Sequence, residues 1–153
     1  MLDATRPRRT FHASRGTRLR DAISKIFARV GIGPACLLST RGAKTGRLHT
    51  TPVIPVERDG KRWLVAPYRT VAWVHNARAA GQVTIHRGRD TREYAVREVR
   101  PDEAAPILKS YIAIARATQP YFDARKDSPV VDFLDEANRH PVFELSRLGT
   151  EEP

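Results

Sequence analysis

The sequence has little cysteine and no long apolar run, and both shortages limit what the chain can be. Its 153 residues include one cysteine, so an internal disulfide and a metal site built on several cysteines are excluded. That residue, Cys36, lies in the apolar segment PACLLS, where we expect it to be buried. No apolar stretch approaches the ~18–20 residues that a membrane-spanning helix needs. The basic N-terminus has no apolar block behind it, so we expect no secretory signal and a cytoplasmic protein.

Catalytic patterns based on metals or on an activated serine are also missing. The five histidines are scattered along the chain without the spacing of metal ligands, so we expect no metal site. No G-x-S-x-G sequence is present, which argues against a hydrolase of the nucleophile-elbow type.

Acidic residues are in the minority. The chain has 27 Lys and Arg against 17 Asp and Glu, a net charge of +10. Such a balance attracts anions, including nucleic acids and acidic small molecules. The sequence has no helix-turn-helix, zinc-finger or RNP-type aromatic pattern, so specific nucleic-acid binding is not expected.

The N-terminal residues differ from the rest of the chain. Residues 1–16 are rich in arginine and have no apolar periodicity, so we expect a flexible basic arm. Residues 17–150 have the length and composition of a single domain. Apolar residues at helical spacing from Leu19 to Val30 predict its first helix, which Gly31 ends.

Strand-like segments dominate the remainder of the sequence. They cover residues 35–40, 48–57, 62–67, 82–87, 92–99 and 141–146. Asp59-Gly60 between the second and third segments is a strong hairpin signal. Pro52 and Pro55 predict that the second segment is an edge strand or contains a bulge.

Three helices are expected between the strands, at residues 70–81, 100–120 and 130–140, the second of them capped by Asp102. The strands follow one another in hairpins and do not alternate strictly with long helices. We therefore predict a mainly β, α+β fold: a small antiparallel barrel of about six strands with helices packed outside.

The segment RGAKTGR contains a lysine between two glycines. A P-loop requires an earlier glycine and a helix immediately after the lysine, whereas the residues that follow here are β-branched and contain prolines. The nucleotide-hydrolase interpretation therefore fails. Two interpretations stay open: a basic hairpin turn with no ligand, or an anion clamp made by Arg41, Lys44 and Arg47, with threonine hydroxyls nearby.

The order of motifs along the chain supports the clamp. LLSTRGAKTGRLHTTPV is followed by DGKRWLVAP, by AWVHNARAAGQVTI and later by QPYFD and HPVFEL. This order resembles the deazaflavin-dependent nitroreductase family over roughly residues 35–146. The resemblance implies a split β-barrel oxidoreductase that uses coenzyme F420.

The resemblance also implies roles for individual residues. Lys44 and Thr45 would bind the phosphate side of the cofactor. The remaining cofactor-binding residues implied by the resemblance or by the basic turn are Arg41, Gly46, Arg47, Thr50, Thr51, Pro52, Ala66, Pro67, Tyr68, Trp73 and Asn76. Tyr121 lies where the family has a tyrosine on the substrate side. The chain departs from the family at Ala43 and His49, where basic residues are usual, so Arg41 and Arg47 are expected to supply the charge.

Hydride transfer would be the chemistry of the cofactor, and the protein would supply position and electrostatics. The expected acceptor is a small conjugated, quinone-like or nitro compound. Tyr68 and Tyr121 are the candidates to donate a proton to it or to orient it. Two alternatives stay open: an FMN-binding barrel like the pyridoxamine-phosphate oxidases, and a non-enzymatic module that binds anions or nucleic acid. The resemblance further suggests a homodimer.

Overall fold

The computed structural model describes residues 34–149, so the predicted arm 1–16 and the predicted helix between residues 17 and 33 lie outside the described residues. The described chain contains seven strands, three α-helices and two short 3₁₀ helices. In chain order they are β1 (Cys36–Arg41), β2 (Leu48–Val53), β3 (Val56–Arg58), β4 (Lys61–Val65), α2 (Ala72–Ala80), β5 (Gln82–Arg87), β6 (Asp90–Glu98), α3 (Pro101–Ile114), η1 (Arg116–Tyr121), η2 (Val130–Asp132), α4 (Phe133–Ala137) and β7 (Val142–Arg147).

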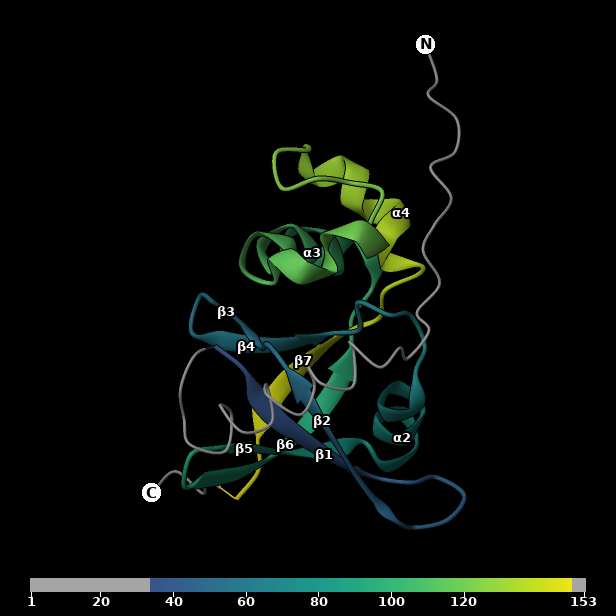
Figure 1. Cartoon of the computed structure of the whole chain (residues 1–153), viewed down its shortest axis with the longest axis vertical. Helices are drawn as coiled ribbons and strands as arrows, with labels where there is room; N and C mark the ends of the chain where they lie inside the picture. The colour runs from purple at the N-terminus through teal and green to yellow at the C-terminus, as the bar shows by residue number, and fades with distance from the viewer. Residues whose placement is uncertain (1–33, 150–153) are drawn as a thin grey trace.

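The strands form one antiparallel sheet in the order β2-β1-β5-β6-β7-β4-β3. The two edge strands, β2 and β3, are consecutive in the chain and are joined only by Ile54 and Pro55. A connection of two residues spans no more than about 10 Å. The sheet must therefore curl until its two edges meet, which gives the open barrel seen in Figure 1. The predicted antiparallel barrel is confirmed.

The structure corrects the strand count from about six to seven. Residues 48–57 were expected to be one strand, but they form two, and these lie at opposite edges of the sheet. Pro55 has no N–H to donate to a strand ladder, so pairing stops there and the chain turns to the other edge. The edge position expected from Pro52 and Pro55 is confirmed for both strands, β2 and β3.

Two turns have the conformations that their residues predict. Asp59 and Gly60 have φ values of 54° and 74° and connect β3 to β4, whose pairing places Arg58 opposite Lys61. Arg87 pairs with Asp90 around a second turn that contains Gly88, with φ of 58°. Positive φ at the central positions matches the right-handed twist of the flanking strands.

The core has two parts, separated by β4. Leu64 and Ala66 belong to the cluster inside the curled sheet, which α2 covers with Trp73, Val74 and Ala77. Trp63 and Val65 belong to the cluster under α3 and α4, which lie together over β3 and β4 (Figure 1). Alternate residues of a strand point to opposite faces, so one strand contributes to both clusters.

Helix α3 differs in detail from its prediction. Its N-cap is Arg100, and Pro101 is the first helical residue, so Asp102 lies within the first turn and does not cap the helix. Proline suits this position because the first N–H groups of a helix have no partner inside it. The α-helix ends at Ile114, and the chain continues as η1 through Pro120. Within residues 34–149, no helix combines the length and the apolar character needed to cross a bilayer.

Candidate functional site

The lysine-containing tract forms a tight turn between β1 and β2. The Gly42 N–H donates to the Arg47 carbonyl at 2.7 Å, and the Gly46 N–H donates to the Gly42 carbonyl at 2.9 Å. Gly46 has a φ of 69°, a value that glycine adopts without strain. A Cβ on Gly42 would lie 2.8 Å from Thr45 Oγ1 and 3.1 Å from His49 Nε2. Gly46 therefore suits the conformation of the turn, and Gly42 leaves room for the side chains of Thr45 and His49.

Three basic side chains surround this turn, and all three are exposed. Arg41 donates to the Gly46 carbonyl at 3.3 Å. Among the described residues, Arg41, Lys44 and Arg47 form no ion pair with an acidic side chain, although arginines elsewhere in the fold do. The turn therefore carries three positive charges that are available to an anionic ligand.

Asn76 joins the turn to helix α2. Its Oδ1 accepts from the Ala43 N–H at 3.0 Å, and its Nδ2 donates to Thr40 Oγ1 at 3.2 Å. Asn76 is 6% exposed and Thr40 is 3% exposed. The predicted site residue Asn76 thus fixes the backbone beside Lys44 from within the fold.

Strand β2 continues from the turn along the edge of the sheet. Thr50 faces Ser39 on β1, and their hydroxyl oxygens are 3.0 Å apart. Thr51 and Pro52 follow and are half-buried. These three predicted residues lie on the edge strand nearest the basic turn.

A second group of predicted residues follows β4. Ala66 and Pro67 are buried, and Tyr68 is half-buried. The Tyr68 ring meets the Tyr121 ring edge to face, with centroids 4.8 Å apart. The structure therefore brings together two tyrosines that are far apart in the sequence.

The backbone next to Tyr68 is strained. Arg69 has a φ of 70°, a left-handed conformation that residues other than glycine seldom adopt. Its carbonyl accepts from the Val71 N–H at 3.0 Å. Strain of this kind is concentrated at functional sites because the surrounding structure must impose it.

Tyr111, on helix α3, is a buried tyrosine near Tyr68. Burial raises the pKa of Tyr111, and the nearby Tyr68 raises it further, against a smaller opposing effect of the hydrogen bond with Thr118. Tyr111 therefore holds its proton firmly and is a poor acid. Tyr68 and Tyr121, which are half-buried, are better placed to reach a ligand.

Trp73 is a core residue in this structure. Its ring is 7% exposed and packs against Phe143 at a centroid distance of 5.7 Å. Asn76, which follows about one turn later on α2, bonds to the basic turn.

Two buried polar residues near the second group were not predicted. Glu136 and His140 are each 1% exposed, and His140 Nδ1 lies 3.1 Å from the Ala66 carbonyl. The only sequence signal for them was a Glu-x-x-x-His spacing that brings both side chains to one face of a helical segment.

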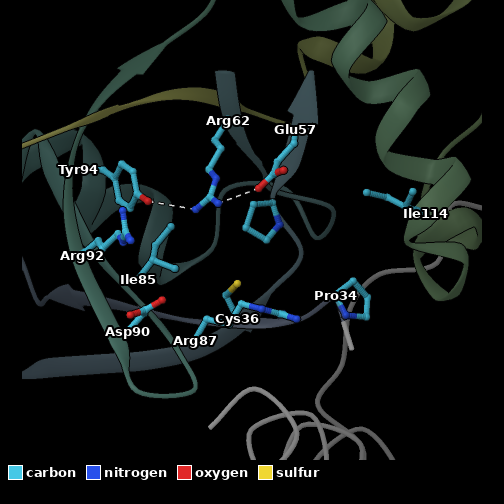
Figure 2. Close-up of a pocket in the computed structure, with 11 residues that line it drawn as sticks. Pro34, Cys36, Glu57, Arg62, Ile85, Arg87, Asp90, Arg92, Tyr94 and Ile114 are labelled. Atoms are coloured by element: carbon cyan, nitrogen blue, oxygen red, sulfur yellow. Dashed lines mark hydrogen bonds and ion pairs between the residues drawn. The ribbon is translucent and has the colours of Figure 1, made fainter. Parts of the chain in front are cut away.

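A hollow of about 570 Å³ lies elsewhere (Figure 2). Cys36, at the start of β1, lines it, whereas the basic turn follows the end of β1, so the two lie at opposite ends of that strand. Among its lining residues, Arg62 bridges Glu57 at 2.8 Å and the Tyr94 hydroxyl at 3.1 Å. No predicted site residue lines this hollow. Within residues 34–149 no three His, Cys, Asp or Glu side chains are grouped to hold a metal ion.

The curled sheet defines a split-barrel protein whose β1–β2 turn carries three exposed basic side chains. The model of the F420H(2)-dependent quinone reductase family matches residues 12–130, and the chain belongs to that family. It is therefore an F420-dependent oxidoreductase, and the resemblance to the F420-dependent split-barrel reductases is confirmed.

Solved structures share the fold. An F420-H2 dependent reductase is 23% identical, with 74% of this chain and 94% of that chain covered and a TM-score of 0.52. A domain-swapped dimer is 22% identical, with 87% and 100% covered and a TM-score of 0.52. A conserved hypothetical protein from Mycobacterium tuberculosis is 17% identical, with 94% and 86% covered and a TM-score of 0.55.

Proposed function

We propose that this protein reduces a small quinone to its hydroquinone at the expense of reduced F420. The acceptor takes one hydride from the reduced cofactor, which is oxidised to F420, and one proton, so that two electrons and two protons are transferred in total. The observation that carries the proposal is the basic turn, whose three exposed cations have no acidic partner among the described residues. The family match supports a quinone as the acceptor class.

The turn would hold the phosphate and the acidic tail of F420. Lys44 and the Thr45 hydroxyl would bind the phosphate, and Arg41 and Arg47 would neutralise the remaining charge. Gly46 would let the backbone approach the ligand, since it has no side chain and no atom lies within 4 Å of the place a Cβ would take. Thr50, Thr51 and Pro52 would line the path from the phosphate toward the ring system.

The ring system would lie against the segment after β4. Ala66 and Pro67 are buried and would hold this segment in place from within, so the half-buried Tyr68 would meet the ring system. Trp73 packs on Phe143 in the core. Asn76 would act through the turn that it holds and not through a contact with the cofactor. When bound, the reduced cofactor supplies the hydride, and these residues supply its position.

Tyr68 and Tyr121 would form the wall on the acceptor side. Both rings are half-buried and meet edge to face, so each keeps part of its surface accessible. A planar conjugated acceptor can stack on a tyrosine ring, and a phenol can donate a hydrogen bond or a proton to a quinone oxygen.

Side-by-side fluorescence titrations with F420 and FMN test the cofactor, and turnover of a water-soluble benzoquinone and a nitro compound tests the acceptor. We expect micromolar or tighter F420 binding, weaker FMN binding, and faster reduction of the quinone. Lys44→Ala should weaken F420 binding by about 10- to 100-fold, the value of a charge-assisted hydrogen bond.

Arg89→Ala is the matched control, since it removes the same charge from the exposed turn between β5 and β6. If Lys44→Ala and Arg89→Ala lost the same F420 affinity, the loss would come from the lower net charge, and a specific anion clamp would be refuted. Faster turnover of the nitro compound would make that the acceptor class, and reduction of neither compound would refute the proposed activity.

We also propose that two copies of the chain associate. The support is the solved structure of a domain-swapped dimer with the same fold. Light scattering coupled to size-exclusion chromatography tests it, and the mass of a single chain at micromolar concentration would refute it.

A further inference from the structure

Glu136 and His140 are buried ionisable groups that the proposed chemistry does not use. Each is 1% exposed and lies beside apolar core side chains such as Phe122 and Phe133. Burying such groups costs free energy unless their polar atoms find partners. Their partners therefore indicate what the pair accomplishes.

Glu136 binds the backbone just beyond Tyr121. Its Oε1 accepts hydrogen bonds from the N–H of Asp123 at 2.6 Å and from the N–H of Ala124 at 2.9 Å. Two backbone donors on one carboxylate oxygen fix the segment that leaves η1. Tyr121 is the last residue of η1 and precedes this anchor by two residues.

His140 binds the backbone just before Tyr68. Its Nδ1 lies 3.1 Å from the Ala66 carbonyl, and because a carbonyl only accepts, Nδ1 carries a hydrogen. The Ala66 N–H in turn donates to the carbonyl of Pro141, next to His140, at 2.9 Å. The imidazole stacks on Phe122, with centroids 4.0 Å apart and planes 22° apart.

The two side chains also face each other. His140 Nε2 lies 3.4 Å from Glu136 Oε2, a close polar contact whose geometry falls short of a hydrogen bond. Burial alone would raise the pKa of Glu136. The polar contact with His140, the hydrogen bonds from the two backbone N–H groups and the charge of Arg139 outweigh burial and hold the pKa below its ordinary value.

Arg139 is the other charged group that faces the pair. Its guanidinium lies 3.5 Å from Glu136 Oε2 and 3.3 Å from Asp123 Oδ2. The anionic form of Glu136 is thus stabilised from both sides.

We propose that Glu136 and His140 are positioning residues that set the spacing between the Tyr68 and Tyr121 segments of the acceptor site, an inference that rests on the proposed function. The chain of contacts runs from Tyr121 through the backbone N–H groups of Asp123 and Ala124 to Glu136, then to His140, and from its Nδ1 to Ala66 and Tyr68. Helix α3 packs against both β4 and η1, and this series of contacts adds directional hydrogen bonds to that apolar packing.

Stability alone does not account for such a pair. Replacing a buried ion pair by well-packed apolar residues is often neutral or stabilising. Apolar residues cannot form directional hydrogen bonds. Glu136 forms them with the segment after Tyr121, and His140 forms one with the segment before Tyr68. An error of about 1 Å in the position of a group at a reacting centre can cost about 100-fold in rate.

The test compares three variants. Glu136→Gln keeps the geometry without the charge, since its amide oxygen can accept from both N–H groups and its NH₂ can donate to a neutral His140. Glu136→Leu removes both links. His140→Phe keeps the stacking on Phe122 but removes the bond to Ala66. Glu103→Gln is the matched control, because Glu103 pairs with Arg97 at 2.6 Å on the exposed surface between α3 and β6.

Three readouts are measured on each variant: the nuclear Overhauser effect between the Tyr68 and Tyr121 rings, F420 affinity, and kcat and KM for the quinone. We expect Glu136→Leu and His140→Phe to lose the ring-to-ring signal and to lower kcat/KM by about 10- to 100-fold. F420 affinity should fall less than kcat/KM, because the basic turn that would hold the phosphate is not linked to this pair. Glu136→Gln and Glu103→Gln should resemble wild type in all three.

Unchanged ring contacts and kinetics in folded Glu136→Leu or His140→Phe protein would overturn the proposal. If neither apolar variant folds while Glu136→Gln does, the pair serves the stability of the core and the positioning role is also overturned. A wild-type protein that binds F420 but reduces no acceptor would refute the proposed function, and the ring-to-ring signal would still report on the coupling.

Discussion

Replacing Asn76 with alanine should weaken F420 binding from a position that the cofactor need not touch. The substitution removes the acceptor of the Ala43 N–H and the donor to Thr40 Oγ1. A typical intramolecular hydrogen bond contributes about 0.5–1.5 kcal/mol, so two of them amount to about 1–3 kcal/mol. For a chain of this length we expect the melting temperature to fall by roughly 3–9 °C.

The effect on affinity follows from the freedom that the turn gains. Without Asn76, the turn between Gly42 and Arg47 keeps its internal hydrogen bonds but loses its attachment to α2. If the binding-competent arrangement falls to about a tenth of the population, F420 affinity falls about tenfold, or about 1.4 kcal/mol. Lys44→Ala should instead weaken binding without lowering the melting temperature, because Lys44 is exposed.

Fluorescence titration and thermal unfolding, measured on the same samples, separate the two effects. Asn138→Ala is the control, since Asn138 is an exposed asparagine just after a helix. If Asn76→Ala destabilised the protein but bound F420 as tightly as wild type, the link between the attachment and the binding turn would be wrong. If it weakened binding without any loss of stability, direct contact with the cofactor would replace positioning.

Other perturbations give further predictions. Gly42→Ala should lower F420 affinity several-fold, because the new Cβ would displace the Thr45 hydroxyl and the His49 ring. The free energy of unfolding should fall by at most about 1 kcal/mol. An unchanged affinity in the titration would contradict this. Because the pKa of Glu136 in the folded protein lies below its ordinary value of 4.5, Glu136 contributes stability above that value and loses it as the pH falls further. Urea unfolding between about pH 3 and pH 6 should therefore show a shallower acid dependence for Glu136→Gln, and identical pH profiles would count against it. Deletion of residues 1–16 should leave F420 affinity within about twofold, and a tenfold loss would show that the basic arm takes part in binding.

Local pattern was sufficient for most of the elements because strand alternation, turn residues and helix periodicity are short-range properties. The Asp59-Gly60 hairpin is an example, since both residues have the positive φ that the turn requires. The division of residues 48–57 was not predicted, because the partner of β2 is β1 and the partner of β3 is β4. Pairing of that kind is decided by the whole sheet and not by the segment itself.

In the candidate site, too, short sequence patterns revealed the local features and not the contacts between distant segments. The basic turn was visible as consecutive residues, and the tyrosines were found through the resemblance to a family. Glu136 and His140 were missed because their partners lie 13 and 74 residues away, at Asp123 and Ala66. Asn76 was singled out, but its attachment to Ala43, 33 residues away, was not foreseeable from the sequence.

Strand β7 has a consequence for the synthesis of the protein. It is the last strand of the described fold, yet it lies between β6 and β4 and contributes Phe143 and Leu145 to the inside of the barrel. While the chain is being made, β4 and β6 can form hairpins with their sequence neighbours, but each keeps one unpaired edge. Exposed edges recruit other strands, so the nascent chain is open to aggregation until residues 142–147 emerge. Closure of the barrel, and with it the juxtaposition of the two tyrosines, must wait for the ribosome to finish nearly the whole domain.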